Sequence, residues 1–353
     1  MLNIKNTKEV KLSNQEYQNY SKQIVLENIG IQGQKKLKKA KVLIIGAGGL
    51  GCPIMIYLAV SGIGNIGIID ADKIETSNLN RQILYNTNDI KDFKVISAQK
   101  KIKKINNNCI VIKHQHKLNT ENSIEIISHY DIVIDATDNF KTRYVIDKIC
   151  YKLHKVYIYG AVDQFEGQIA TFNYKNGIRY KNLYKPELLL ENNTCNRNGI
   201  MGIATGYTGT LQAIETIKII VGLNKKCKNF LLAYDIITIT NKKRKIYLKR
   251  NKNNQINKLD LNNIIFNHQL NKIKHNVIIV DLRKNFDFHR KHIKKSINIP
   301  IKKFKLHETI KLIEYFKKTN NLIIYCNRLE RSIIASRFLN KKNILHYILH
   351  PIE

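Results

Sequence analysis

The chain contains no tryptophan, few prolines and no long apolar run that is free of charge. Only four of its 353 residues are proline. The longest candidate for a membrane-spanning helix, residues 199–223, is interrupted by Glu215 and Lys218, which suits a helix packed inside a protein better than one in lipid. The first residues lack the apolar core of a signal peptide and contain acids that transit peptides usually avoid. We therefore expect a soluble protein, without a membrane partner, that works in the compartment where it is made.

Acidic residues are also scarce. The chain has 27 Asp and Glu against 60 Lys and Arg, for a formal net charge of +33. Such an excess often marks binding to nucleic acid or anionic membranes. Here lysine is spread along the whole chain with many Asn and Ile, all residues of A+T-rich codons, and no aromatic residues interleave with the basic ones as in base-stacking surfaces. We expect no nucleic-acid partner, and location in the plastid stroma if the gene is organellar or in a bacterial cytoplasm otherwise.

Paired cysteines are missing too. The six cysteines lie far apart, and none belongs to a C-x-x-C pair: Cys52, Cys109, Cys150, Cys195, Cys227 and Cys326. This spacing argues against a zinc site and against a secreted disulfide framework. A cysteine with a special role is therefore better explained as a single reactive thiol.

The chain does contain a regular alternation of apolar runs and helical stretches. In its first part the alternation predicts a Rossmann-like α/β fold, with a mostly parallel sheet and helices on both faces. We expect parallel strands at 42–45, 66–69, 109–112, 132–136 and 156–161, an antiparallel strand at 167–174, a helix at 207–221, and edge strands at 234–238 and 245–248.

A polar stretch separates this part from a second, smaller α/β region. Residues 249–258, KRNKNNQINK, have almost no core-forming side chains and are typical of a linker. Beyond them we expect helices at 259–270, 309–317 and 331–340, with strands at 277–282 and 322–326. The predicted domains are thus residues 1–248 and residues 259–353, joined by the linker.

One segment near the N-terminus predicts a nucleotide site. A buried strand at 42–45 leads into a glycine-rich turn, a helix and a second strand that ends in acids. The residues that fit a phosphate-binding turn and the ribose-binding carboxylates that follow it are Gly46, Gly48, Gly49, Gly51, Asp70 and Asp72. By itself this segment fits a nicotinamide or flavin enzyme as well as any other nucleotide-binding protein.

Three further groups of residues narrow the choice. Asn78 and Arg81 follow the acids, and an arginine offers two parallel bonds to phosphate. Lys94 opens a helical stretch, where it can act as a point charge. Asp138 and Asn139 follow the strand at 132–136, at the edge of a parallel sheet where ligands bind, and a carboxylate there suits Mg²⁺. Nucleotidyl transfer needs such cations and a metal, whereas hydride transfer does not.

Together these motifs resemble a known superfamily. GAGGLG, IDAD, SNLNRQ, the helix that starts at Lys94, and DATDN are similar to the ubiquitin-activating-like proteins. Within them the nearest likeness is to the adenylyltransferases of sulfur-carrier proteins, of the molybdopterin-synthase type. The likeness continues in YSKQIVLENIGIQGQKKL, GAVDQFEGQI and TGYTGTLQAIETIKIIVG, so it covers roughly residues 15–248.

The resemblance implies ATP- and Mg²⁺-dependent adenylation of the C-terminal glycine of a small ubiquitin-like carrier that ends in Gly-Gly, before a thiocarboxylate forms there. It points to the small subunit of molybdopterin synthase, with a thiamine or tRNA-thiolation carrier as the alternative. In this family Gly48 would lie against the nucleotide and Asp70 would bind the ribose. The phosphates would be held by Asn78, Arg81 and Lys94, and Mg²⁺ by Asp138.

The family also implies a homodimer in which a basic residue near the N-terminus reaches the partner's ATP. Lys22 stands where the family has arginine. Two C-x-x-C pairs usually hold structural zinc in the family, but the matching stretches here read YKNL and NQIN (180–183 and 254–257), so we predict no zinc. Cys195 matches a crossover-loop cysteine that forms a thioester or a disulfide with the carrier in some members. An ordinary loop cysteine is the alternative.

The second region resembles a rhodanese domain over roughly residues 255–353. VDLR (280–283), INIP (297–300) and YCNRLERS (325–332) carry the likeness. Cys326 lies between a strand and a helix N-terminus beside Arg328 and Arg331, a setting that lowers the pKa of a thiol. The resemblance implies that Cys326 accepts sulfur from a donor such as a cysteine desulfurase, with Arg331, Asp281 and Arg283 as supports. The usual loop glycine is replaced by Leu329 or Glu330.

Two interpretations from other classes remain open at this stage. One is a dinucleotide-dependent oxidoreductase, which the glycine-rich turn alone would fit. The other is a basic nucleic-acid-binding protein, which the net charge alone would fit.

Overall fold

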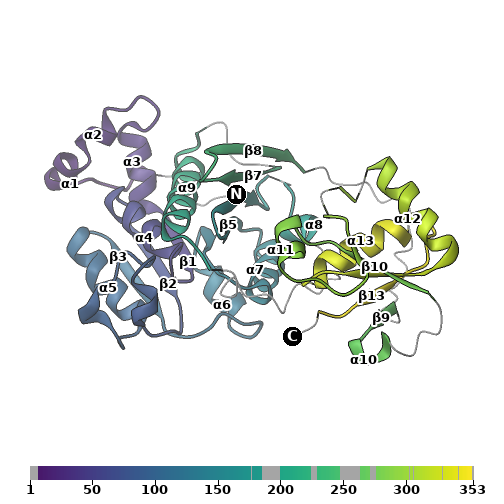
Figure 1. The fold of residues 1–353 in the computed structure, drawn as a ribbon. Coiled ribbons are helices and arrows are strands. Elements are labelled where there is room, and N and C mark those ends of the chain that lie inside the picture. Colours follow the sequence, from purple (N-terminus) through teal and green to yellow (C-terminus); the bar gives the residue numbers. More distant parts are fainter. Residues whose placement is uncertain are drawn as a thin grey trace. The chain divides into compact units, whose positions relative to one another are not determined.

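The structure, a computed structural model, describes residues 7–175, 177–184, 199–223, 229–246, 263–270, 276–301, 303–304, 306–327, 329–340 and 342–351. The chain divides into two compact units, and Figure 1 draws the first from purple to the dark green of β8 and the second from light green to yellow. The first comprises Met1–Tyr184 and Glu191–Arg250, and the second Lys185–Leu190 and Asn251–Glu353. The linker predicted at 249–258 lies outside the described residues.

An eight-stranded sheet forms the centre of the first unit, with the strand order β3-β2-β1-β4-β5-β6-β7-β8. Neighbours from β3 to β5 run parallel, and those from β5 to β8 run antiparallel. The strands are β1 (Lys41–Ile45), β2 (Asn65–Ile69), β3 (Ile110–His114), β4 (Ile132–Asp135), β5 (Val156–Asp163), β6 (Glu166–Phe172), β7 (Phe230–Asp235) and β8 (Thr240–Lys245). The predicted parallel strands and the antiparallel turn-back at β6 are therefore confirmed.

Helices cover both faces of this sheet. They are α1 (Asn14–Asn19), α2 (Ser21–Ile24), α3 (Gly30–Lys39), α4 (Gly51–Val60), α5 (Lys94–Ile105), α6 (Ser123–Ser128), α7 (Phe140–Lys152), α8 (Tyr180–Leu183) and α9 (Gly202–Val221), with the 3-10 turns η1 (Thr76–Asn78) and η2 (Thr87–Asp89). The helix predicted at 207–221 is confirmed and begins five residues earlier.

Strand β1 explains why both faces are covered. Successive strand residues point to opposite faces, and Val42 and Ile44 pack in one apolar cluster while Leu43 and Ile45 pack in the other. All four are buried. An uninterrupted apolar strand of this kind is stable only between two layers of helices, which is the arrangement in Figure 1.

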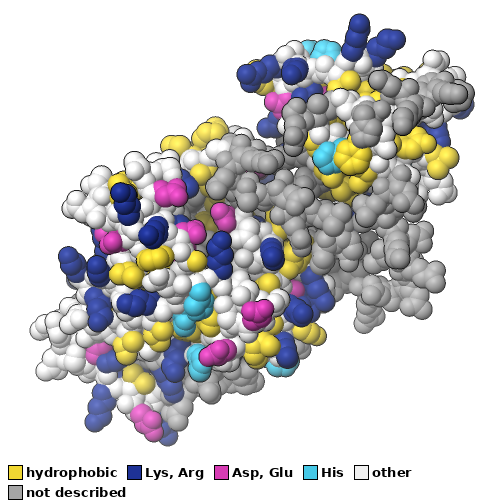
Figure 2. Space-filling model, turned by 90° about the horizontal axis from the view of Figure 1, so that it is seen from below, with side chains coloured by type: hydrophobic (Ala, Val, Ile, Leu, Met, Phe, Trp, Pro, Cys, Tyr) yellow, Lys and Arg dark blue, Asp and Glu magenta, His cyan; other side chains and the backbone are white. Residues whose placement is uncertain are grey.

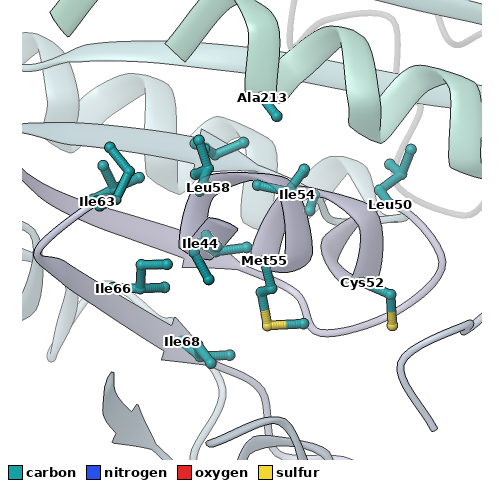
Figure 3. Close-up of a cluster of buried hydrophobic side chains, with 14 of the residues drawn as sticks. Ile44, Leu50, Cys52, Ile54, Met55, Leu58, Ile63, Ile66, Ile68 and Ala213 are labelled. Atoms are coloured by element: carbon teal, nitrogen blue, oxygen red, sulfur yellow. The ribbon is translucent and has the colours of Figure 1, made fainter. Parts of the chain in front are cut away.

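Helix α4 packs on β1 and against α9, which itself contacts β5 and β6, and α4 links the glycine-rich turn to the core. Ile54, Met55 and Leu58 are completely buried, and Ala213 of α9 faces them from above (Figure 3). Burying each of the three large side chains contributes roughly 1.5–3 kcal/mol. The turn before α4 is thus anchored to a rigid layer.

The second unit holds a parallel five-stranded sheet with the order β11-β10-β12-β13-β9. Its elements are β9 (Ile264–Ile265), α10 (Asn267–Leu270), β10 (Val277–Asp281), α11 (Asn285–Arg290), β11 (Ser296–Asn298), α12 (His307–Thr319), β12 (Asn321–Tyr325), α13 (Leu329–Asn340) and β13 (Tyr347–Leu349). The strands expected at 277–282 and 322–326 and the helices at 309–317 and 331–340 are confirmed.

Three predicted elements, two strands and a helix, are wrong in part. The edge strands lie at β7 and β8 instead of 234–238 and 245–248, because residues 236–239 form the exposed turn between them. The helix predicted at 259–270 is helical only at Asn267–Leu270 within its described part, because Ile264 and Ile265 pair with β13 as a strand.

Charge is dispersed over the surface in the part of the chain that the structure describes. Figure 2 shows Lys and Arg side chains scattered over the visible face among acidic, histidine and apolar ones. No described helix is both long and apolar enough to cross a lipid bilayer.

Candidate functional site

A cleft of about 1250 Å³ opens in the first unit where β1, β2 and β4 end. The carboxyl ends of parallel strands are the usual ligand-binding edge of such a sheet. The predicted nucleotide-binding residues that line this cleft are Gly46, Gly48, Gly49, Asp70, Asp72, Asn78, Arg81, Lys94, Asp138 and Asn139. Gly51 does not line it. The fold therefore brings together residues that lie almost a hundred positions apart in the sequence.

The glycines of the turn serve two different purposes. Gly46 has a φ of +101°, and a Cβ there would lie 2.6 Å from the carbonyl oxygen of Ala136. A Cβ on Gly51 would lie 2.1 Å from the carbonyl oxygen of Gly46, so this position closes the turn onto α4. A Cβ on Gly48 would meet only Gln82 Nε2, at 3.7 Å. Gly48 thus leaves open space on the cleft side, where a phosphate can approach the backbone.

Asp70 ties the second strand to this turn. Its Oδ2 accepts a hydrogen bond from the backbone N–H of Ala47, and its Oδ1 accepts one from that of Asp72, both at 2.8 Å. Burial raises the pKa of the Asp70 carboxyl above its ordinary value, and the nearby charge of Lys94 opposes that rise. The carboxylate is held in a fixed orientation at the edge of the cleft.

Two cations reach the cleft from different elements. Lys94, the first residue of α5, is 8% exposed and places Nζ 3.1 Å from Asp72 Oδ2. Arg81 follows η1, and its guanidinium donates to the carbonyl oxygen of Ser77 at 2.8 Å and to Asn80 Oδ1 at 3.0 Å. Asn78, the last residue of η1, is buried and accepts from the backbone N–H of Glu75. Lys94 and Arg81 thus offer positive charge to an anionic ligand.

Asp138 lines the cleft from the loop between β4 and α7. Its side chain is exposed, and Asn139 Nδ2 lies 3.5 Å from its Oδ1. Asn139 caps α7, with Oδ1 accepting from the backbone N–H of Thr142 at 2.9 Å. Within the described residues no group of three or more metal-binding side chains occurs. A single carboxylate fits Mg²⁺ bound mainly by phosphate oxygens and water.

Several cleft residues escaped the sequence analysis. Gln82 lies inside the SNLNRQ motif, and Arg143 shares the buried face of α7 with Ile146 and Cys150, at a helical spacing that could have revealed it. Residues 116–120 also line the cleft. Residues 116–120 follow β3 and have no apolar periodicity, so the only sequence signal that they line a site is their position after a strand.

Other predicted residues lie elsewhere. Lys22 belongs to α2, is exposed and does not line the cleft. Cys195 lies outside the described residues, as does the stretch 254–257 that bears on zinc. The other stretch, 180–183, forms α8. The absence of zinc stays a prediction.

In the second unit, Cys326 follows β12 directly and is completely buried in the apolar cluster of that unit. Its Sγ lies 3.4 Å from Asn327 Oδ1. Arg331 is half-buried in the first turn of α13, and Arg328 lies outside the described residues. The predicted order of strand, cysteine, loop and helix is thus present.

Asp281 and Arg283 form a tight pair at the end of β10. Asp281 is fully buried, and Arg283 donates to both of its carboxylate oxygens, at 2.6–3.0 Å. This bonding raises the pKa of Arg283. The guanidinium also stacks over Tyr325, 5.3 Å from the ring centre. Because Tyr325 immediately precedes Cys326, the pair supports the strand end that carries the thiol.

Comparison with known proteins agrees with this arrangement. The ThiF family model matches residues 20–257, and the rhodanese-like domain model matches residues 266–350. A probable molybdopterin-synthase adenylyltransferase of Gracilaria tenuistipitata var. liui is 43% identical over 345 residues, which cover 96% of this chain and 97% of that protein.

Two further proteins match about two thirds of the chain. The adenylyltransferase and sulfurtransferase MOCS3 of Culex quinquefasciatus is 44% identical over 229 residues, covering 64% of this chain and 52% of that protein. The crystal structure of E. coli MccB with ATP shares the fold, with a TM-score of 0.55 and 24% identity, and the likeness covers 65% of this chain and 71% of that one. The chain therefore belongs to the ThiF family and carries a rhodanese-like domain after it, as its motifs predicted.

Proposed function

We propose that the first unit adenylates the C-terminal glycine of a small ubiquitin-like sulfur carrier at the expense of ATP. The observation that supports this most is the single cleft that combines the open backbone at Gly48, the cations of Arg81 and Lys94, and the carboxylate of Asp138. The relatives named adenylyltransferases support it independently.

The reaction requires mainly that the carboxylate and ATP are held in position and that positive charge faces the phosphates. An oxygen of the glycine carboxylate bonds to the α-phosphorus of ATP, and the bond from that phosphorus to the bridging oxygen breaks. Pyrophosphate leaves with the electron pair, and the carrier keeps AMP as an acyl-adenylate. No base is needed, because the attacking carboxylate is already ionised at neutral pH. Cations that face the phosphates accelerate such a step by stabilising the charge that develops on the leaving group.

The cleft residues divide this work. Asp70 would accept hydrogen bonds from the ribose hydroxyls, and Asn78, Arg81 and Lys94 would hold the phosphates. Asp138, with Asn139 beside it, would hold Mg²⁺. The metal, when bound, supplies further positive charge near the leaving pyrophosphate.

We propose that the second unit supplies sulfur as a persulfide on Cys326, loaded by a donor such as a cysteine desulfurase. The terminal sulfur would bond to the carbonyl carbon of the acyl-adenylate, and AMP would leave with the electron pair. A second thiolate would then bond to the Cys326 sulfur and release the thiocarboxylate. Cys195 stays a candidate for a thioester or a disulfide with the carrier, with an ordinary loop cysteine as the alternative. The domains expected at 1–248 and 259–353 would divide adenylation from sulfur delivery.

A homodimer is part of the proposal, with Lys22 of one protomer acting at the partner's ATP. Helix α9 presents Ile203, Tyr207 and Ile214 on one side with 66%, 42% and 46% of their surface exposed. Exposed apolar stripes of this kind favour a protein interface.

The small subunit of molybdopterin synthase is the proposed carrier, and the plastid is the proposed location. The relatives from Gracilaria tenuistipitata and Porphyra purpurea support both. Mass spectrometry of candidate carriers after incubation with ATP, Mg²⁺ and a sulfur donor distinguishes this carrier from those of thiamine synthesis and tRNA thiolation. A thiocarboxylate on another carrier only would overturn this assignment.

Exchange of label between pyrophosphate and ATP tests the adenylation. The expected result is exchange that depends on a carrier ending in Gly-Gly and on Mg²⁺. Binding of NAD without exchange would favour the oxidoreductase instead. Salt-sensitive RNA binding without ATP turnover would favour the nucleic-acid-binding interpretation.

A further inference from the structure

A buried ion pair lies directly beneath the loop that carries Asp138, and the proposed reaction does not use it. Asp135, the last residue of β4, is completely buried. Arg143, the fourth residue of α7, is 3% exposed and places Nε 3.9 Å from Asp135 Oδ2. Removing two charges from water is costly, so such a pair persists where its other bonds are of use.

The pair is joined through one residue of the loop. Thr137 donates its backbone N–H to Asp135 Oδ1 at 3.1 Å and its hydroxyl to the same oxygen at 2.7 Å. Arg143 donates from its guanidinium to the carbonyl oxygen of Thr137 at 2.6 Å. Both backbone polar groups of Thr137 are therefore bound, one by each partner. The next residue is Asp138.

Aromatic rings hold Arg143 from its other side. The guanidinium carbon lies 5.2 Å from the centre of the Tyr159 ring and 5.5 Å from that of Phe140. Tyr159 is itself buried in the core. A lysine at this position would keep the charge but lose the planar group that bonds and stacks at the same time.

We infer that Arg143 is a positioning residue, which fixes the loop at Thr137 so that the Asp138 carboxylate stays at the edge of the cleft. Arg143 borders the cleft, but its side chain is almost fully buried beneath the loop, so it acts through the Thr137 carbonyl. The role of Asp138 as a metal ligand rests on the proposed function, but the fixing of the loop does not.

The chain offers a matched control, an arginine from another element that pairs with a carboxylate of the same helix. Arg179 pairs with Asp147 of α7 at 2.8 Å, is largely buried, and stacks over Tyr151 at 3.8 Å. It does not line the cleft. Arg179→Lys therefore disturbs a similar pair without touching the loop, and it separates positioning from a general loss of stability.

The first experiment is hydrogen–deuterium exchange on the full chain, without metal or nucleotide. We expect Arg143→Lys to speed amide exchange in peptides covering residues 136–142 by about tenfold or more, and Arg179→Lys to leave it unchanged. Equal exchange in the two variants would overturn the inference.

A double variant, Asp135→Asn with Arg143→Met, removes both charges and so avoids a lone buried carboxylate. This double variant should keep a native near-UV circular dichroism spectrum and still show faster amide exchange at residues 136–142. Exchange there as slow as in the wild type would also contradict the positioning role.

The second experiment measures how pyrophosphate exchange depends on Mg²⁺. Residues that orient a metal ligand typically change metal affinity about 10- to 100-fold, so Arg143→Lys should raise the half-saturating Mg²⁺ concentration by that factor. Arg179→Lys should not. If the wild-type chain adenylates no carrier but Arg143→Lys still speeds exchange in the loop, the proposed function is wrong and the inference stands. If the wild-type chain adenylates its carrier but Arg143→Lys leaves exchange in the loop unchanged, the proposed function stands and the inference is wrong.

Discussion

Among single residues, Lys94 connects the local fold most directly to the proposed chemistry. It is buried and charged, it starts α5, and it forms an ion pair with the largely exposed Asp72. Lys94→Met keeps the length of the side chain and removes the charge. Because loss of one charge-stabilising group typically costs about 10²–10³ in rate, we expect carrier-dependent pyrophosphate exchange to fall by that factor. Lys100→Met, an exposed lysine on the same helix, should exchange like the wild type. A Lys94→Met variant as active as Lys100→Met would rule out a role at the phosphates.

The turn glycines give a second prediction, in which one substitution lowers stability and another lowers ATP affinity. Gly51→Ala would push a Cβ against the carbonyl oxygen of Gly46, so we expect a loss of about 1–3 kcal/mol in the free energy of unfolding. Gly48→Ala meets no close neighbour and should change stability by less than about 0.5 kcal/mol. Its methyl group would occupy the space where a phosphate approaches, so ATP affinity should fall about tenfold or more. Urea unfolding and equilibrium dialysis with ATP measure the two effects. Undiminished ATP binding by Gly48→Ala would place the nucleotide elsewhere.

At the same scale, sequence motifs predicted the polar groups that point into the cleft but not the layer beneath them. Arg81, Lys94 and Asp138 stand in recognisable strings at strand and helix ends. The helical spacing of Arg143 indicates a buried position, but its bond to the loop carbonyl of Thr137 and its pairing with Asp135 have no spacing signature. Tertiary structure is required to reveal it.

At the scale of elements, apolar periodicity predicted the central strands and missed the edges. β1, β2 and β4 each contain an uninterrupted run without polar side chains (42–45, 66–69 and 132–134), because both faces of these runs are buried. β8 is TNKKRK with every residue exposed, so it has no apolar pattern to find. The β-branched residues 236–240 have high strand propensity, yet they include a turn where Ile237 and Ile239 are exposed. β9 is set by its distant partner β13, which the sequence around it does not reveal.

A prediction on pH belongs to the contact between α13 and β13. His346 is buried, with Nδ1 2.7 Å from the carbonyl oxygen of Ile344 and Nε2 2.6 Å from Ser336 Oγ. Since a carbonyl only accepts, Nδ1 carries the proton and Nε2 accepts from the serine. Burial lowers the pKa of His346 from its ordinary value of 6.5.

The unfolded chain therefore binds more protons than the folded one as pH falls below about 6.5, and the second unit should lose stability there. Urea unfolding at about pH 7.5 and at about pH 5.5, followed by pulsed amide exchange at one fixed pH in peptides from β12 and β13, measures this. His346→Asn should flatten the dependence. An equal slope in wild type and variant would assign the effect to other groups.

At the scale of the whole molecule, the proposed dimer makes Lys22 and Asp138 serve the same active site from different protomers. Lys22→Ala and Asp138→Ala should each abolish most of the exchange activity when alone. When the two are mixed in equal amounts and allowed to re-associate, half of the dimers are mixed, and each has one intact site. Activity should then return to about a quarter of the wild-type value. If mixing restores nothing, Lys22 does not act across a dimer.

The most direct test of adenylation is the intact mass of the carrier after incubation with this protein, ATP and Mg²⁺ in the absence of a sulfur donor. We expect a carrier whose mass increases by one AMP, with the adduct on its C-terminal glycine. A carrier shortened by that glycine should remain unmodified, and so should an intact carrier incubated with Asp138→Ala. An unmodified carrier with the wild-type protein, under conditions where the protein binds ATP, would contradict the central claim.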